Sequence, residues 1–481
     1  MWLIGSKTPK GDGYLRATSP NERRCVARES LGFYHALIVG GIYQFSEPVE
    51  LASISTYVHA LRQCVRHHPQ LCCTVAEPGT QSPYYKACAC LDLSRHVQIL
   101  PQRDGRHGVQ SVEEALPVML DSMGPPHIPA WKITVIPFSQ QRCFLGFSFS
   151  HSLGDGMSGI AFHRTFLDAL QETGVERELI WTPNLQQLDP PFDTSTNLPI
   201  SWSFLLRPLL GVILPKRVAS LLGFGITAPA GIWTASKMFY NPEKHQTCVK
   251  VLSIDAATVK EALKVCRAHQ GKLTGLLHQL IINSLSEAFA HRDDLDHLAA
   301  RTALNMRGPV GKSNDEMGNF ITAVTQFHAI KKLAGSDIVQ EVDWESVQAV
   351  TERLAAAAKE LRDQPLGLLR YLSDVRSWVS SQLGEPRDCS YEVSNLVSFQ
   401  PARPTSRCAV TEMIFCQPAD VLGAPLNFNV VSVANGPLSI AVSWQAGALA
   451  LASEEDEDDF VERICQGIRS GFGQLVSRAP G

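Results

Sequence analysis

Two apolar runs that lead into a glycine-containing loop and then a helix constrain this chain more than any other feature. Residues 131–138 and 142–150 are separated by a short Ser-Gln-Gln turn, and they are predicted to form a buried antiparallel strand pair. The next residues, 151–156, read HSLGDG, and apolar positions then recur at helical spacing over residues 158–170. A loop held between a strand and a helix keeps its side chains in fixed positions, which is where chemistry is usually placed.

The rest of the chain alternates between helical and extended patterns. Apolar residues at spacings of three and four over residues 51–65 predict a helix, with Ser53 as its cap and Pro69 as its stop. The elements predicted after it are strands at 71–75 and 84–91, a helix at 275–290, strands near 302–306 and 321–327, a helix at 344–361, strands near 392, 410 and 428, a hairpin at 434–437 and a terminal helix to residue 476. We therefore expect an α/β fold built on mixed sheets.

A proline-rich polar stretch between residues 176 and 202 separates two halves of comparable size. A chain of 481 residues is long enough for two to four domains, at roughly 100 to 200 residues each. We predict an N-terminal lobe at 1–175 that carries the HSLGDG loop, a connector at 176–245, and a C-terminal lobe at 246–481.

Composition excludes several classes of protein. The chain has 43 Lys and Arg against 47 Asp and Glu, a formal net charge of −4, so it lacks the basic surface that a nucleic acid partner requires. An odd number of cysteines, 13, and a first segment too poor in apolar residues for a secretory signal favour a reducing, cytoplasmic location. Residues 204–226 are apolar but interrupted by charges and prolines, so we expect no transmembrane span. A peripheral contact of this segment with an endoplasmic reticulum or lipid-droplet surface stays open.

Two groups of potential metal ligands lack the spacing of a metal site. Cys72, Cys73, Cys88 and Cys90 fall on two predicted strands, where neighbouring residues point to opposite faces. Residues 291–297 contain several His and Asp residues, but they read as a solvated loop after a helix. We expect no metal and no bound cofactor.

The HSLGDG loop has the pattern HxxxDG, which combines a base with a shaped turn. An imidazole with a pKa of about 7 is suited to removing a proton from a hydroxyl or amine that attacks an acyl carbonyl, so His151 is the candidate base. Gly154 and Gly156 permit a sharp turn, and Asp155 is expected to anchor the loop through an arginine. On the motif alone, a surface His before an ordinary Asp-Gly turn is the alternative.

Several separated segments resemble the fungal alcohol acetyltransferases, a family within the superfamily of chloramphenicol acetyltransferase, the plant BAHD acyltransferases and the condensation domains of nonribosomal peptide synthesis. The matching segments are NER at 21–23, LGFY at 31–34, RHHPQL at 66–71, PAW at 129–131, the loop region at 147–158, LNMR at 304–307, MGN at 317–319, VSN at 393–395 and the hairpin at 431–444. The DFGWG block of the BAHD branch is absent, which places the chain outside that branch. One HxxxDG implies one active site per chain.

The resemblance implies a site as well as a fold. Two lobes like those of chloramphenicol acetyltransferase would enclose an active-site tunnel, with acyl-CoA entering one mouth and the acceptor the other. Arg307 is the implied partner of Asp155, with Arg301 as the second choice. The implied substrate or oxyanion contacts are Ser394, Asn395, Asn305 and Thr274. For Ser394 and Asn395 an ordinary strand-end turn is the alternative, and Thr274 is expected first of all to cap the following helix.

The activity that the resemblance implies is acyl-CoA-dependent O-acylation of an alcohol, with acetyl-CoA as the expected co-substrate. Transfer would be direct, with His151 as general base and no covalent enzyme intermediate. A hydroxylated secondary metabolite is the favoured acceptor. Short fusel-type alcohols, amine acceptors, an acyl donor on a carrier protein, and a non-catalytic binding role are the alternatives. We expect a monomer, because nothing in the sequence requires a partner chain.

Overall fold

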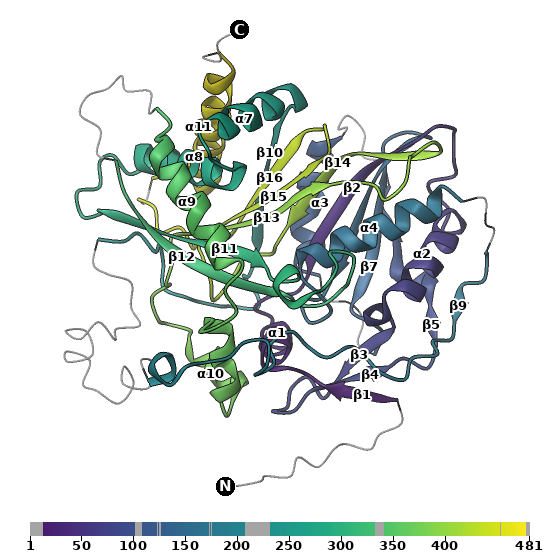
Figure 1. Cartoon of the computed structure of the whole chain (residues 1–481). Coiled ribbons are helices and arrows are strands. Elements are labelled where there is room, and N and C mark those ends of the chain that lie inside the picture. Colours follow the sequence, from purple (N-terminus) through teal and green to yellow (C-terminus); the bar gives the residue numbers. More distant parts are fainter. Residues whose placement is uncertain are drawn as a thin grey trace.

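The computed structural model contains two large sheets with helices packed around them (Figure 1). It describes residues 13–101, 108–122, 124, 127–172, 174, 176–206, 231–331, 341–452 and 454–477. Helices and strands alternate along both halves of the chain, and the sheets contain parallel as well as antiparallel pairs. The predicted α/β class with mixed sheets is confirmed.

The first large sheet is built around the predicted strand pair. Its strand order is β14-β2-β8-β7-β6, and all neighbours are antiparallel except β6 and β7. The strands are β2 (Leu37–Phe45), β6 (Val97–Ile99), β7 (Trp131–Pro137), β8 (Arg142–Phe149) and β14 (Cys408–Cys416). Every residue of β8 after Arg142 is buried, because side chains pack against both faces of the sheet at its centre. The pairing of residues 131–138 with 142–150 is therefore confirmed.

The second large sheet has the strand order β10-β16-β15-β13-β11-β12. These strands are β10 (Thr247–Ile254), β11 (His297–Asn305), β12 (Ile321–Ala329), β13 (Tyr391–Phe399), β15 (Leu426–Val433) and β16 (Leu438–Gln445). The central strand β13 runs parallel to both of its neighbours. The predicted hairpin at 434–437 joins β15 to β16.

Helices cover the sheets and contribute to the core together with the strands. They are α1 (Pro20–Ser30), α2 (Ser55–His67), α3 (Val109–Leu120), α4 (Gly156–Leu170), α7 (Ala256–Ala268), α8 (Leu273–Ala288), α9 (Trp344–Ala357), α10 (Val375–Ser381) and α11 (Glu457–Ser477), with short 3₁₀ turns that include η4 (Pro365–Tyr371). A small sheet joins β1 (Tyr14–Ala17), β3 (Cys73–Ala76) and β4 (Tyr84–Ala87), and β5 (Leu91–Asp92) pairs with β9 (Ile180–Trp181).

The helix that follows the HSLGDG loop is locked to the first sheet. The ring of Phe162 in α4 stacks on Phe147 of β8, with ring centroids 3.8 Å apart. His163, fully buried, receives a hydrogen bond from Tyr43 of β2 at 2.7 Å on Nδ1 and donates from Nε2 to the Val39 carbonyl at 2.8 Å. Both ring nitrogens of His163 therefore make hydrogen bonds with β2, and α4 cannot move along the sheet without breaking these bonds.

Strand β14 comes from the C-terminal half of the sequence, but it belongs to the first sheet, whose other strands come from the N-terminal half. It lies at residues 408–416, yet it pairs antiparallel with β2 over the register Cys408↔Phe45 to Cys416↔Ile38. The predicted division into lobes at 1–175 and 246–481 stays a prediction, but the sheets do not follow it strand by strand. A crossing of this kind links the two halves through backbone hydrogen bonds.

Several local predictions were wrong at their boundaries. Ser53 does not cap α2: the helix begins at Ser55, the N-cap residue Ile54 makes no side-chain cap bond, and the Ser53 hydroxyl lies 2.8 Å from that of Ser55. The helix from Trp344 ends at Ala357 rather than 361, and the strand expected at 84–91 is split into β4 and β5. Apolar periodicity persists past the last backbone hydrogen bond, so it marks element ends poorly.

The first helix was missed although the sequence contains a signal for it. At the start of α1, the Ser19 side chain accepts a hydrogen bond from the Glu22 backbone, and the Glu22 side chain accepts one from the Ser19 backbone. Pro20 occupies the first helical position, where proline is favoured. No membrane-spanning helix occurs among the described residues. The apolar stretch at 204–226 lies almost entirely outside them, from residue 207 onward.

Candidate active site

The HSLGDG loop is fixed by the two elements that flank it. Strand β8 ends at Phe149, and Asp155 is the N-cap residue of α4. The Asp155 carboxylate accepts a hydrogen bond from the Ser158 backbone N–H at 3.1 Å, and the Ser158 hydroxyl accepts from the Asp155 backbone N–H at 3.2 Å. A carboxylate at this place also interacts favourably with the helix dipole. His151 is thereby held at the start of a short, doubly anchored loop.

Arg307 pairs with Asp155, as the resemblance implied. Its Nη1 lies 2.8 Å from Asp155 Oδ2 and its Nη2 lies 2.9 Å from Oδ1, so the contact is bidentate. The two side chains are 0% and 1% exposed. The second-choice partner, Arg301, instead pairs with Asp388 at 2.5 Å. Two parallel bonds in a dry environment make the Asp155–Arg307 contact strong and directional.

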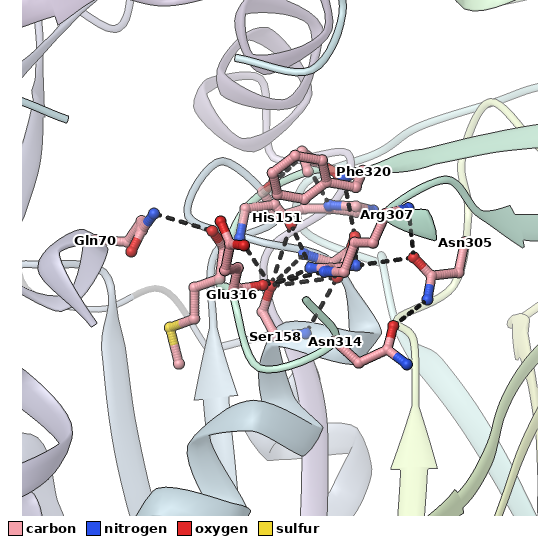
Figure 2. A network of polar contacts seen from close by, with 12 residues as sticks. Gln70, His151, Ser158, Asn305, Arg307, Asn314, Glu316 and Phe320 are labelled. Carbon is pink, nitrogen blue, oxygen red and sulfur yellow. Dashed lines mark hydrogen bonds and ion pairs between the residues drawn. The ribbon is translucent and has the colours of Figure 1, made fainter. Parts of the chain in front are cut away.

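The segment at 316–320 closes around this ion pair (Figure 2). Arg307 Nε donates to the Glu316 carbonyl at 3.1 Å, and Nη2 donates to the Gly318 carbonyl at 3.1 Å. The Phe320 backbone N–H donates to Asp155 Oδ2 at 3.0 Å, and the guanidinium lies over the Phe320 ring, 4.8 Å from its centroid. Every oxygen of Asp155 therefore faces the protein, which agrees with an anchoring role.

The two loop glycines are required for space rather than for backbone conformation. Neither Gly154 nor Gly156 has a positive φ, so neither position needs glycine for its backbone conformation. A Cβ on Gly154 would lie 2.4 Å from Ser158 Oγ, and one on Gly156 would lie 2.5 Å from Leu396 Cδ2. A side chain at either position would force its neighbour, Ser158 or Leu396, to shift.

His151 is held in its neutral form. Burial lowers the pKa of its imidazole most, and the cationic side chains of Arg28 and Arg24 lower it further, whereas Asp155 acts in the opposite direction; the pKa is about 4. The ring lies near Tyr34, with centroids 5.7 Å apart. A neutral imidazole at physiological pH can accept a proton, which is the first requirement of a general base.

Asn319 holds the backbone and ring of His151 from the other half of the chain. Its Nδ2 donates to the His151 carbonyl oxygen at 2.6 Å and lies 3.3 Å from the ring Nδ1. Asn319 thus ties the backbone at His151 and one edge of its ring to the segment that precedes β12. Its block, MGN, was matched in the sequence, but no role was assigned to it.

The buried carboxyl group of Glu29 lies beside the HSLGDG loop, and the sequence did not single it out. Glu29 accepts a hydrogen bond from the Ser150 hydroxyl, whose oxygen lies 2.7 Å from that of Ser152. Burial raises the pKa of Glu29 to about 7, and the Ser150 bond opposes this rise. The hydroxyls on both sides of His151 are therefore tied to α1, which further restricts the loop.

A cavity of about 670 Å³ opens in front of His151. Its walls come from α1, β11, β12, β13, η4 and α10, so both halves of the sequence contribute. The predicted residues Ser394, Asn395 and Asn305 line it together with His151, Asp155 and Gly156. The volume and the mixture of apolar and polar walls are typical of a small-molecule site. Among the described residues, no group of three His, Cys, Asp or Glu side chains could hold a metal ion.

Two of the residues predicted to contact substrate, Asn305 and Thr274, also make hydrogen bonds within the protein. Asn305 Oδ1 accepts from the Arg307 backbone at 3.1 Å and from its Nη1 at 3.3 Å, so this amide supports the ion pair. Thr274 does not cap α8, because the helix already begins at Leu273, where Lys272 is the N-cap residue and makes no side-chain cap bond. Its hydroxyl accepts from Asn395 Nδ2 at 3.1 Å instead. The threonine was expected to be a cap because Ser and Thr favour helix starts, but it lies one residue inside the helix.

Comparisons with known proteins agree with this geometry. The alcohol acetyltransferase family model matches residues 102–466. The probable alcohol acetyltransferase crmB of Aspergillus fumigatus is 22% identical, over 95% of this chain and 99% of its own length. The N-acetyltransferase SLI1 of Saccharomyces cerevisiae is 23% identical, over 66% of this chain and 72% of its own length. The structure of the TRI3 trichothecene 15-O-acetyltransferase from Fusarium sporotrichioides has a TM-score of 0.66 at 12% identity, covering 97% of this chain and 99% of that one.

Replacing Asp155 by Asn tests the buried ion pair. The change leaves the fully buried Arg307 guanidinium without a counter-charge, so we expect the free energy of unfolding in urea to fall by about 3 to 5 kcal/mol, with loss of activity. The control is Asp294→Asn, which breaks another bidentate pair, with Arg292 at 2.7 Å, on the surface. This variant should unfold like the wild type. If Asp155→Asn loses rate but keeps full stability, Asp155 acts directly in catalysis and the anchoring role is wrong.

Replacing Asn319 by Leu tests the positioning of His151. The substitution keeps the volume but removes the donor to the His151 carbonyl, so we expect kcat to fall about 10- to 100-fold while KM changes less than threefold. The control is Asn314→Leu, an exposed amide 2.9 Å from Asn305 that makes no contact with His151. A parallel loss in both variants, or a loss confined to KM, would contradict the positioning role.

Proposed function

We propose that this chain, which belongs to the alcohol acetyltransferase family, is an acyl-CoA-dependent O-acyltransferase that transfers an acetyl group directly to an alcohol. The family model covers most of the chain, so the resemblance read from the sequence and the expectation of an acetyltransferase enzyme are confirmed. The observation that carries the proposal is a neutral imidazole, His151, at the wall of a cavity large enough for a small molecule.

The proposed reaction is a single transfer. His151 Nε2 takes the proton of the acceptor hydroxyl as its oxygen attacks the thioester carbonyl of acetyl-CoA. The tetrahedral oxyanion then collapses, the carbon–sulfur bond breaks, and the imidazolium returns the proton to the CoA thiolate. In this direct transfer no residue of the enzyme forms a covalent bond with the acyl group.

Ser394 and Asn395 remain the proposed donors to the oxyanion. Both line the cavity at β13, and Ser394 makes no hydrogen bond to another described side chain that would occupy its hydroxyl. The Asn395 amide donates to Thr274 at 3.1 Å, so one of its two amide hydrogens stays available. A hydroxyl or amide aimed at the developing charge contributes when that charge appears in the transition state.

The favoured acceptor is a hydroxylated secondary metabolite. The cavity has an apolar wall formed by η4 and α10, with Leu366, Leu369, Leu372 and Trp378. This wall suits a carbon skeleton larger than a short fusel-type alcohol. The similar fold of a trichothecene O-acetyltransferase agrees with an acceptor of that size.

An amine acceptor is the second candidate. One relative that matches two thirds of this chain carries the name N-acetyltransferase. The same neutral base would take a proton from an attacking amine, so the geometry of His151 does not separate the two. Parallel assays with matched alcohols and amines distinguish them.

Replacing His151 by Ala tests the proposed base. We expect thiol release from acetyl-CoA to fall by about 100-fold or more, because general base catalysis contributes about 10² to 10⁴ in rate. The assay follows free CoA over a panel of alcohols, amines and hydroxylated metabolites, and the melting temperature is measured in parallel. The control is His163→Gln, which alters a buried histidine of α4 that does not line the cavity. Near-normal turnover by a folded His151→Ala protein would rule out the mechanism.

The pH dependence of the reaction tests the state of His151. Its pKa of about 4 lies below the usual value of 6.5, so the ring loses its proton as pH rises through about 4 and is neutral above that. With a neutral alcohol as acceptor, kcat/KM should therefore be constant from pH 5.5 to pH 8, a range in which circular dichroism verifies folding. A fall of activity with a midpoint near pH 6.5 would show that the imidazole is solvated in the working enzyme.

A further inference from the structure

Helix α1 presents two arginines to the cavity in front of His151. Arg24 and Arg28 are four residues apart, so they lie on the same face of the helix, one turn or about 6 Å apart along its axis. The Arg28 guanidinium lies over the Tyr34 ring, 4.4 Å from its centroid, and the Tyr34 ring is 5.7 Å from that of His151. These contacts place the arginine face of α1 beside the reacting atoms.

Of the two, only Arg28 has a counter-charge. Its Nη2 lies 2.6 Å from Asp420 Oδ1. Arg24 donates from Nε and Nη2 to the Asn21 side-chain oxygen at 3.3 and 3.0 Å, and among the described residues no carboxylate lies within ion-pair distance of it. An arginine that faces a cavity and has no carboxylate partner can bind an anionic group of a ligand.

Burial makes the unpaired state of Arg24 costly. Its pKa is lowered, mainly by loss of solvent and also by the like charges of Arg28 and Arg301, with Asp420 opposing them. Burial lowers the pKa of Arg28 too, but the charge of Asp420 and its hydrogen bond more than offset this, and the pKa of Arg28 is raised. A ligand carboxylate at Arg24 would supply the missing compensation.

The acidic residues of the cavity do not fill this role. Asp420 and Asp388 already pair with Arg28 and Arg301. The carboxyl of Glu392 is buried, its pKa is raised by burial, and the cations that act on it are Arg301 and Arg28 rather than Arg24. None of these three carboxyl groups forms an ion pair with Arg24.

We propose that Arg24 is the specificity-determining anchor for a carboxylate carried by one of the two substrates close to its reacting atom. The phosphates of CoA are too far from the thioester to reach this position, because the pantetheine arm separates them. The carboxylate belongs either to the acceptor, which would then be a hydroxy acid with an apolar body along η4 and α10, or to a dicarboxylic acyl group. This inference rests on the proposed use of the cavity as the substrate site.

Binding to the full-length protein, without turnover, tests the anchor. Isothermal titration calorimetry compares 3-hydroxydecanoate with its methyl ester, and succinyl-CoA with butyryl-CoA, so that each pair differs by one negative charge. We expect the acid of one pair to bind the wild type at least about tenfold more tightly than its neutral partner. The pair that shows the preference identifies which substrate carries the carboxylate.

Matched variants assign the preference to Arg24. Arg24→Gln should remove it while leaving the affinity for the neutral partner unchanged, and Arg24→Lys should retain most of it. The control is Arg23→Gln, the adjacent arginine of α1, which does not line the cavity. The anchor is wrong if neither acid is preferred, if no member of either pair binds, or if the preference survives in Arg24→Gln.

Failure of the anchor and failure of the proposed function give different results. If thiol release depends on His151 but no acid preference is found, the function stands and the anchor does not. If the acid preference is lost in Arg24→Gln but no acceptor supports thiol release, the anchor stands and the acyl transfer does not. Removing the Arg24 charge should also raise the pKa of His151, observed as an acid limb at higher pH in the Arg24→Gln profile.

Discussion

The buried ion pair between Asp155 and Arg307 is the contact on which the site depends. Desolvating two charges is expensive, and here the cost is offset by two short bonds to each other and by further bonds to Ser158, Glu316, Gly318 and Phe320. Because the carboxylate caps α4 and the guanidinium follows β11, the pair joins the two halves of the chain at the loop that carries His151. A catalytic loop fixed from both sides loses little entropy when substrate binds.

The position of His151 trades basicity against electrostatic stabilisation. Burial and the charges of Arg28 and Arg24 hold its pKa at about 4, so the imidazole is a weaker base than a solvated histidine. In the proposed transfer, the same positive charges would favour the alkoxide and the oxyanion, since both are negative. These charges would then lower the energy of the transition state while they disfavour protonation of His151, so the two effects would partly cancel.

Local patterns in the sequence predicted the strand pair, the loop and α4, because each depends on residues close together in the chain. The Asp155–Arg307 pair came from resemblance alone, since nothing local links residues 152 positions apart. Asn319 and Arg24 had no assigned role, because an amide or an arginine acquires one only from what folding brings beside it. The lack of space at Gly156 could not be predicted either, because it comes from Leu396 on a distant strand, whereas at Gly154 it comes from the nearby Ser158 side chain.

Chemistry and specificity lie on different parts of this fold. His151, Asp155 and Arg307 follow or precede elements of the two sheets, which β14 ties together through its pairing with β2. Part of the cavity wall comes from β11, β12 and β13, and the rest includes α1, η4 and α10, which are outside every sheet. Substitutions there can change the charge and shape of the cavity without disturbing the sheets or the ion pair. The proposed anchor, Arg24, lies on α1, in that part of the wall.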